Sequence, residues 1–112
     1  MNAKTPLSHA QKLTILCRVE PGCLGPTGAS LVDGFCVFAQ PRLEAMDPEV
    51  VNWKLVPRKD KLLPEMHYQM GNKVLTYDQA GKYLSLFGKE IEDYEEDFHG
   101  VLANLVNEHL GR

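Results

Sequence analysis

Three cysteines, Cys17, Cys23 and Cys36, are the residues of this sequence whose chemistry can be judged most directly from their spacing. Structural zinc sites use cysteine pairs about two to four residues apart, because a tight turn must direct both sulfur atoms at one ion. The five residues between Cys17 and Cys23 do not fit this spacing, and the sequence has no Cys-x-x-Cys redox pair. We therefore expect neither a metal site nor a bound cofactor. An odd number of cysteines also cannot form a complete set of disulfides, so reduced thiols are expected.

Cys23 is the candidate reactive thiol, because it lies in a loop rich in glycine and proline. Cys17 and Cys36 are expected to be small apolar residues of the interior, where free cysteines are most often found.

The loop itself, residues 21–29, is a second candidate site, because glycine-rich turns before a helix can bind anions through backbone N–H groups. However, it lacks both the dinucleotide-binding spacing and the Gly-Lys-Ser/Thr ending of the phosphate-binding loop, and it is expected to follow a helix. A structural corner is therefore the preferred interpretation. The alternative is a small-molecule or anion-binding protein, or a thiol-dependent enzyme, with a site that comprises Gly22, Cys23, Gly25, Gly28 and Ser30.

His67 has the clearest context for acid–base catalysis, since Glu65 and Gln69 are expected on the same face of its strand. Solvated histidines on a half-exposed sheet are nevertheless far more common than catalytic ones. The sequence also has no Gly-x-Ser-x-Gly nucleophile elbow and no His-Glu-x-x-His zinc motif. The balance favours a protein that is not an enzyme.

The segment of residues 90–97 carries the most concentrated charge in the chain, six carboxylates in eight positions. Apolar residues recur through this segment and beyond it at gaps of three and four, which is typical of a helix that packs along one side. This stripe either covers the sheet of its own subunit or reaches a partner. The interaction residues expected from the pattern are Tyr94, Phe98, Val101, Glu92, Asp93, Glu95 and Glu96.

Length and composition limit the class of protein. A chain of 112 residues is expected to form one domain, residues 1–112, with residues 1–5 as a flexible leader. A net charge of -3 without a strong basic cluster argues against nucleic-acid binding. No segment approaches the roughly 20 apolar residues of a membrane span, and the N-terminus has no apolar signal segment. The protein is therefore expected to be cytoplasmic.

The N-terminal half shows helical patterns. Ser8 and Gln11 have the spacing of a capping box, and the apolar residues after them recur at helical spacing, which predicts a helix over residues 8–20. Residues 30–40 are expected to be a helix that ends at Pro41, with a buried strand as the alternative.

The next segment shows strand patterns. β-Branched and aromatic residues predict a strand over residues 50–56. Residues 65–76 alternate as a hairpin does, and a type II′ turn at Gly71 would set Tyr68 opposite Leu75 on the buried face.

Helical patterns return at the C-terminus. Thr76 and Gln79 form a second capping box, so a helix is expected to begin there, and a final helix is expected over about residues 89–110. The expected element order is ααβββαα. This order favours an α+β domain, a small antiparallel sheet of about three strands with a 65–76 hairpin, covered by helices.

These features favour a small acidic, non-catalytic protein that acts as a protein–protein interaction or regulatory module. A three-stranded sheet leaves two edges, and the wide apolar stripe suits a helix that touches a second copy, so a homodimer is expected. The carboxylates of residues 90–97 favour another protein with a basic surface as the partner. Neither nucleic acid nor a membrane is an expected partner.

Overall fold

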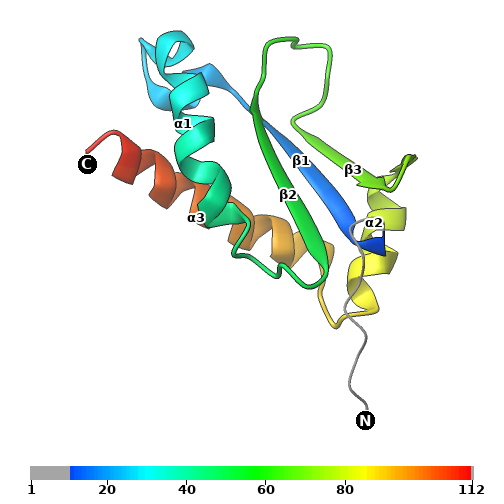
Figure 1. The fold of residues 1–112 in the computed structure, drawn as a ribbon. Coiled ribbons are helices and arrows are strands. Elements are labelled where there is room, and N and C mark those ends of the chain that lie inside the picture. The colour runs from blue at the N-terminus through cyan, green and yellow to red at the C-terminus, as the bar shows by residue number, and fades with distance from the viewer. Residues whose placement is uncertain (1–10, 112) are drawn as a thin grey trace.

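The computed structural model describes residues 11–111 and shows a four-stranded mixed sheet with three α-helices (Figure 1). The expected α+β class is confirmed, whereas the expected leader and the Ser8 capping position lie outside the described residues. Within residues 11–111, no helix combines the length and the apolar character needed to cross a bilayer. In chain order the elements are β1 (Leu13–Val19), a short 3-10 helix η2 (Pro21–Leu24), α1 (Gly28–Leu43), β2 (Val51–Pro57), β3 (Met66–Met70), β4 (Lys73–Leu75), α2 (Tyr77–Ser85) and α3 (Ile91–His109).

The first described element is the strand β1, so the helix predicted over residues 8–20 is wrong for residues 13–19. Side chains along β1 alternate between buried and half-buried, which is the two-residue period of a sheet. Leu13, Ile15 and Cys17 all face the core, whereas a helix would spread them around its circumference. The apolar residues of this segment fit both the spacing of a helix and the two-residue period of a strand. Because β1 pairs with β2 on one side and β3 on the other, the extended form is the one adopted.

β1 is a central strand of the sheet, whose order is β2-β1-β3-β4. It pairs in parallel with β2 and antiparallel with β3. The parallel pair exists because α1 carries the chain back to the starting end of β1 before β2 begins. The predicted antiparallel sheet of three strands and the order ααβββαα are therefore wrong in detail. The observed order is βαβββαα, with η2 between β1 and α1.

Residues 30–40 form part of helix α1, so the expected helix is confirmed and the alternative of a buried strand is wrong. The helix runs through Pro41 to Leu43, so the prediction that it ends at Pro41 is wrong. A proline near the end of a helix removes only one backbone hydrogen bond, and Leu43 is fully buried, which holds the last turn against the core.

Elements from β2 onward follow the predicted pattern. Tyr68 pairs with Leu75 in the β3–β4 hairpin, and Gly71 has a φ of 57°, which suits the first central residue of a type II′ turn. Thr76 and Gln79 form the complete capping box, in which each side chain accepts the backbone N–H of the other residue. The helices expected after the hairpin are confirmed as α2 and α3.

One face of the sheet carries the core. Inward side chains of β1, β2 and β3 form a single buried cluster with side chains of the three helices. At its centre the Trp53 ring stacks on Phe98 and on Tyr94 of α3, with ring centroids 4.8 and 5.8 Å apart. The Trp53 indole N–H donates to the Met46 carbonyl at 3.0 Å, so the ring also holds the loop before β2. The expected covering of the sheet by helices is confirmed for this face.

α1 also closes the edge of β2. The Gln40 side chain donates from Nε2 to the Trp53 carbonyl and accepts the Leu55 N–H at Oε1, both at 2.8 Å. Gln40 thus replaces a neighbouring strand for two backbone groups, and Pro57 has no N–H to offer. The opposite edge, β4, has only three residues. Neither edge offers a long ladder for a second copy of the chain.

Gly28 is the tightest point of the connection between β1 and α1. A Cβ atom there would lie 1.7 Å from the Pro21 carbonyl oxygen, which belongs to the backbone and cannot rotate away. We expect Gly28→Ala to lower the free energy of unfolding by about 3 kcal/mol, because η2 must move away from α1. Urea denaturation followed by circular dichroism measures this change.

Gly100→Ala is the matched control. Gly100 is exposed in α3, and a Cβ atom there meets nothing within 4 Å. The same substitution should therefore raise the free energy of unfolding by about 1 kcal/mol, the difference in helix propensity. Equal effects at the two positions would show that the contact with Pro21 does not constrain the loop.

Candidate functional site on the exposed face of the sheet

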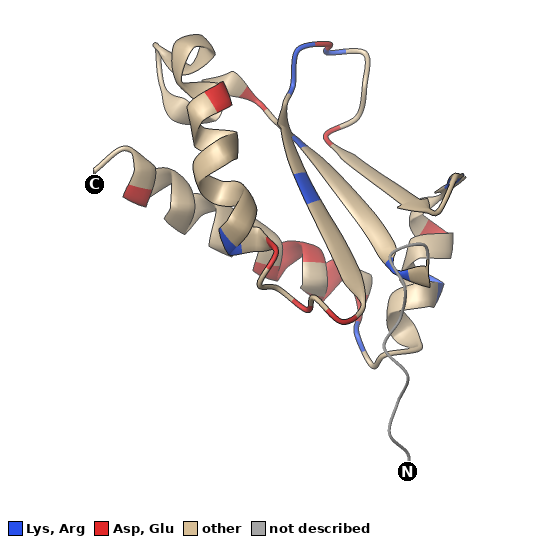
Figure 2. Cartoon of the chain, viewed as in Figure 1, with Lys and Arg blue, Asp and Glu red and all other residues tan. Residues whose placement is uncertain are grey.

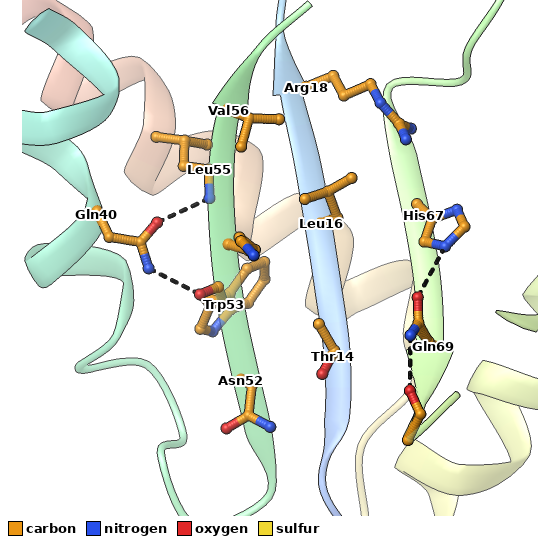
Figure 3. Close-up of a pocket in the computed structure, with 12 residues that line it drawn as sticks. Thr14, Leu16, Arg18, Gln40, Asn52, Trp53, Leu55, Val56, His67 and Gln69 are labelled. Carbon is orange, nitrogen blue, oxygen red and sulfur yellow. Dashed lines mark hydrogen bonds between the residues drawn. The ribbon is translucent and has the colours of Figure 1, made fainter. Parts of the chain in front are cut away.

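The second face of the sheet is not covered by any helix of the described residues, and it forms a broad hollow of about 670 Å³ (Figure 3). Its floor consists of the side chains of β1, β2 and β3 that alternate with the core residues. Gln40 of α1 and Gly71 of the hairpin turn also line it. The lining side chains on the outward positions of the strands are Thr14, Leu16, Arg18, Asn52, Lys54, Val56, His67 and Gln69.

The register of the sheet arranges these side chains in rows that run across the strands. Lys54, Leu16 and His67 form the middle row, because Leu16 is the register partner of the other two. Adjacent strands are about 4.8 Å apart, so the backbone positions of this row span about 10 Å. The flanking rows are Asn52–Thr14–Gln69 and Val56–Arg18.

The strands carry basic residues and no acidic residue. None of the four strands contains Asp or Glu, so all fifteen acidic residues of the chain lie in helices, turns and loops. Figure 2 shows acidic residues gathered on α3, which lies behind the sheet in this view. The exposed face holds Arg18 and Lys54. Glu65 is the nearest carboxylate in the sequence register: its carbonyl accepts the Arg18 N–H at 2.7 Å, while its side chain lies 3.9 Å from Arg58 and does not line the hollow. The lining of the hollow itself is positively charged, on a chain whose net charge is -3.

The polar side chains of this face differ in how firmly they are held. Arg18 Nη1 donates to the Pro64 carbonyl at 2.7 Å, which turns the guanidinium toward the start of β3 (Figure 3). His67 Nε2 lies 3.3 Å from Gln69 Oε1. Lys54 is exposed and forms no ion pair within residues 11–111. Lys54 is therefore the cation of this face that is available to a partner.

This arrangement suits binding better than acid–base catalysis. His67 has the amide of Gln69 as its neighbour, and no carboxylate lines the hollow. Glu65, which the sequence places beside His67, instead lies 3.9 Å from Arg58. In the part of the chain that the structure describes, no group of three or more His, Cys, Asp or Glu side chains is placed to hold a metal ion.

Sequence reasoning identified part of this face. His67 and Gln69 are predicted on the strand face opposite Tyr68, and the structure confirms it, since Tyr68 is buried while the other two line the hollow. The outward residues of β1 were missed because residues 13–19 were interpreted as helical. The sequence signal that favours a strand there is the apolar residue at every second position, Leu13, Ile15, Cys17 and Val19, with the polar Thr14 and Arg18 between them.

The glycine-rich loop is a structural corner that follows a strand, not the helix expected from the sequence. The backbone N–H groups of Cys23, Gly25, Gly28 and Ser30 each donate to a carbonyl three residues earlier, at 3.0–3.2 Å. These four N–H groups are therefore not available to an anion. The geometry favours the structural interpretation over a ligand site made of Gly22, Cys23, Gly25, Gly28 and Ser30.

Cys23 is exposed and Cys17 and Cys36 are buried, as the sequence predicts, although Cys17 lies on the strand β1 and not on the inner face of a helix. Burial raises the pKa of the Cys17 thiol to about 12 and the pKa of the Cys36 thiol to about 11. Both buried thiols therefore stay protonated at neutral pH. Cys23 lines a hollow of about 430 Å³ together with His99 and apolar side chains of α3.

The apolar residues predicted as an interface on α3 are used within the subunit. Tyr94 and Phe98 are buried in the core, where both stack on Trp53. Val101 is half-buried and packs against the same core. The stripe therefore covers the sheet of its own chain, which is one of the two alternatives that the spacing left open.

The carboxylates predicted as interaction residues lie mostly on the outer side of α3. Glu95 differs, because it accepts a hydrogen bond from the Tyr68 hydroxyl. Burial, together with this hydrogen bond, raises the pKa of Tyr68. The exposed carboxylates are Glu92, Asp93 and Glu96.

Comparisons of the chain with protein-family models, with curated proteins and with solved structures found no match.

The three thiols provide a test of the placement of β1 and α1. We expect a thiol reagent at neutral pH to modify Cys23 rapidly, and Cys17 and Cys36 only when the protein unfolds, because those two are buried and protonated. Mass spectrometry counts the modified thiols over time. Cys23→Ser should abolish the rapid phase, and a rapid phase that persists in this variant would contradict the burial of the other two.

Alkaline pH should destabilise the fold. A thiol in the unfolded chain titrates near 9.0, whereas Cys17 in the folded chain keeps its proton to about pH 12, so the unfolded state loses protons first. The free energy of unfolding is therefore unaffected by this group below pH 9 and falls as the pH rises from 9 to 12. The expected slope for Cys17 is at most about 1.4 kcal/mol per pH unit.

Urea denaturation at a series of pH values measures this slope. The pKa values of Tyr68 and Tyr94 are also raised by burial and act in the same direction, so the Cys17 contribution needs its own control. Cys17→Ala removes the thiol and should make the alkaline limb less steep. An unchanged slope in Cys17→Ala would mean that Cys17 is not protected in the folded state.

Proposed function

We propose that this chain is a small, non-catalytic protein-binding module whose partner docks on the exposed face of the sheet. The observation that carries this proposal is the unequal use of the two faces. Helices bury one face in the core, while no helix of residues 11–111 covers the other face across β1, β2 and β3 (Figure 1). An interaction or regulatory role is also what the sequence alone favours.

The shape of the open face favours a macromolecule over a small ligand. Small-molecule sites are concave pockets that bury most of the ligand and are lined mainly by apolar side chains. Here the floor is a sheet surface, and Leu16 and Val56 are the apolar side chains among its outward lining residues. A broad, open surface of this kind can bury a large area against another macromolecule, but it can enclose only a small part of a small molecule.

The residue types favour a protein over a nucleic acid. Single-stranded nucleic acids bind sheet surfaces by stacking bases on aromatic side chains. The aromatic residues of β2 and β3, Trp53 and Tyr68, both turn into the core, where Trp53 stacks on Phe98 and Tyr68 bonds to Glu95. Within the described residues the hollow therefore presents no Tyr, Phe or Trp ring for stacking, and the His67 imidazole is a single ring beside the amide of Gln69.

A second copy of the chain is a poor occupant of this face. Two such faces in contact would bring the Lys54 and Arg18 residues of both copies together, and like charges across an interface are unfavourable. The exposed carboxylates of α3 lie on the other side of the sheet. If they contacted the exposed face of a second copy, the contact would be head-to-tail, and each copy would keep one of these two surfaces free for a further copy. The homodimer expected from the sequence stays a prediction that does not involve this face.

Site-specific photo-crosslinking tests the proposed function. A photoreactive amino acid replaces Leu16, at the centre of the exposed face, and cells that express the variant are irradiated. We expect a discrete protein adduct, identified by mass spectrometry, because Leu16 would lie in the contact.

Val37 is the matched control position, since it is an apolar residue of α1 that is 76% exposed and lies outside this face. Replacement of Val37 should not produce the same adduct. The absence of an adduct at Leu16, or the same adduct at both positions, would refute docking on this face. An adduct of twice the chain mass at Leu16 would identify self-association instead.

A further inference from the structure

The exposed face carries a charge opposite to that of the whole chain. Arg18 and Lys54 contribute two positive charges to it, and no Asp or Glu lines it, although the chain has a net charge of -3. Complementary charge across an interface decides which partners associate and how fast they do so. The face therefore selects a negatively charged partner, against the overall charge of the protein.

The two cations are spread over the face and do not surround one point. Lys54 pairs in register with Leu16, whereas Arg18 lies two residues further along β1 and pairs with Val56. The Arg18 guanidinium is turned toward the Pro64 carbonyl, away from β2 (Figure 3). This distribution fits a partner that carries several negative groups along its surface better than a single small anion.

Apolar side chains are interleaved with these cations. Leu16 lies between Lys54 and His67 in the middle row, with about 4.8 Å between neighbouring strands. A row of uncharged hydrogen-bonding side chains follows along the strands, which comprises Asn52, Thr14 and Gln69. Negative charge, apolar groups and amide groups occur together in a polypeptide, whereas a polyphosphate backbone supplies only the first.

We infer that the partner segment is an acidic polypeptide in which carboxylates flank an apolar side chain. The carboxylates pair with Lys54 and Arg18, and the apolar side chain packs on Leu16. This inference rests on the proposed function, since it specifies the partner of the same face. Lys54 is the principal determinant, because Arg18 already donates to the Pro64 carbonyl.

Titration of the 15N-labelled protein with defined peptides tests the inference. The probe is a short peptide with Glu on both sides of a Leu, and two matched peptides replace each Glu by Gln or by Lys. A single-stranded oligouridylate serves as the nucleic-acid probe. We expect the Glu peptide alone to shift amide signals of β1, β2 and β3, and added salt to weaken its binding.

Two lysine variants make the test specific. Lys54→Glu should weaken binding of the Glu peptide about tenfold or more, because a charge-assisted contact becomes a repulsive one. Lys73→Glu makes the same change in net charge at an exposed lysine whose register places it on the other face of the sheet, and should alter affinity by less than about twofold. Lys54→Gln should give an intermediate loss, and the amide spectrum of each variant reports whether it is folded.

Equal binding of the Gln peptide, binding of the Lys peptide or oligouridylate at this face, or equal effects of Lys54→Glu and Lys73→Glu would each overturn the inference. The crosslinking experiment does not depend on the charge of a chosen peptide. A protein adduct at Leu16 without binding of the Glu peptide would therefore reject the acidic partner and retain the docking face. Failure of both experiments would reject the proposed function as well.

Discussion

The two-residue alternation of β1 is the constraint on which both the core and the candidate site depend. Its inward residues, such as Ile15, are buried, while Leu16 and Arg18 face outward into the hollow. Because β1 has a neighbouring strand on each side, its register is set by both pairings. A shift of one residue would exchange the two sets, moving Arg18 into the core and Ile15 into water. The register that stabilises the fold is thus the same one that builds the binding face.

The helices explain why the two faces differ. Trp53 projects from β2 into α3 and stacks on Phe98, which fixes the longest helix on the core side. The Gln40 amide binds the edge of β2, so α1 is held beside the sheet by directional hydrogen bonds as well as by burial. All three helices pack on the core side, and no helix of residues 11–111 lies over the outward side chains of the strands. Their polarity is what an antiparallel or mixed sheet with one solvated face requires.

Elements with local signals were predictable from the sequence, and those decided by distant contacts were not. The Thr76–Gln79 capping box and the turn at Gly71 involve residues a few positions apart, and both were predicted correctly. Residues 13–19 carry both a helical and a strand spacing, and their pairing with Val51 and the rest of β2 decides between them. The candidate site shares this limit. His67 and Gln69 lie in one strand of the hairpin, and the sequence alone predicts which face they occupy. The centre of the site needs the pairing of Leu16 with Lys54 and His67, which lie on strands far apart in the sequence.

The carboxylates that make the net charge negative are most concentrated in residues 90–97 of the sequence, away from the exposed face of the sheet that we propose as the binding surface. Three of the six carboxylates of residues 90–97 have explanations within the fold: Glu92 and Asp93 in the first turn of α3 interact favourably with the helix dipole, and Glu95 accepts a hydrogen bond from the Tyr68 hydroxyl. Lys54 has no such explanation. It stands exposed in the middle of a strand, a position in which lysine is disfavoured, and no ion pair holds it within residues 11–111. β2 is an edge strand, where a lysine discourages pairing with another chain, and the proposed contact with an acidic partner would use the same charge a second time.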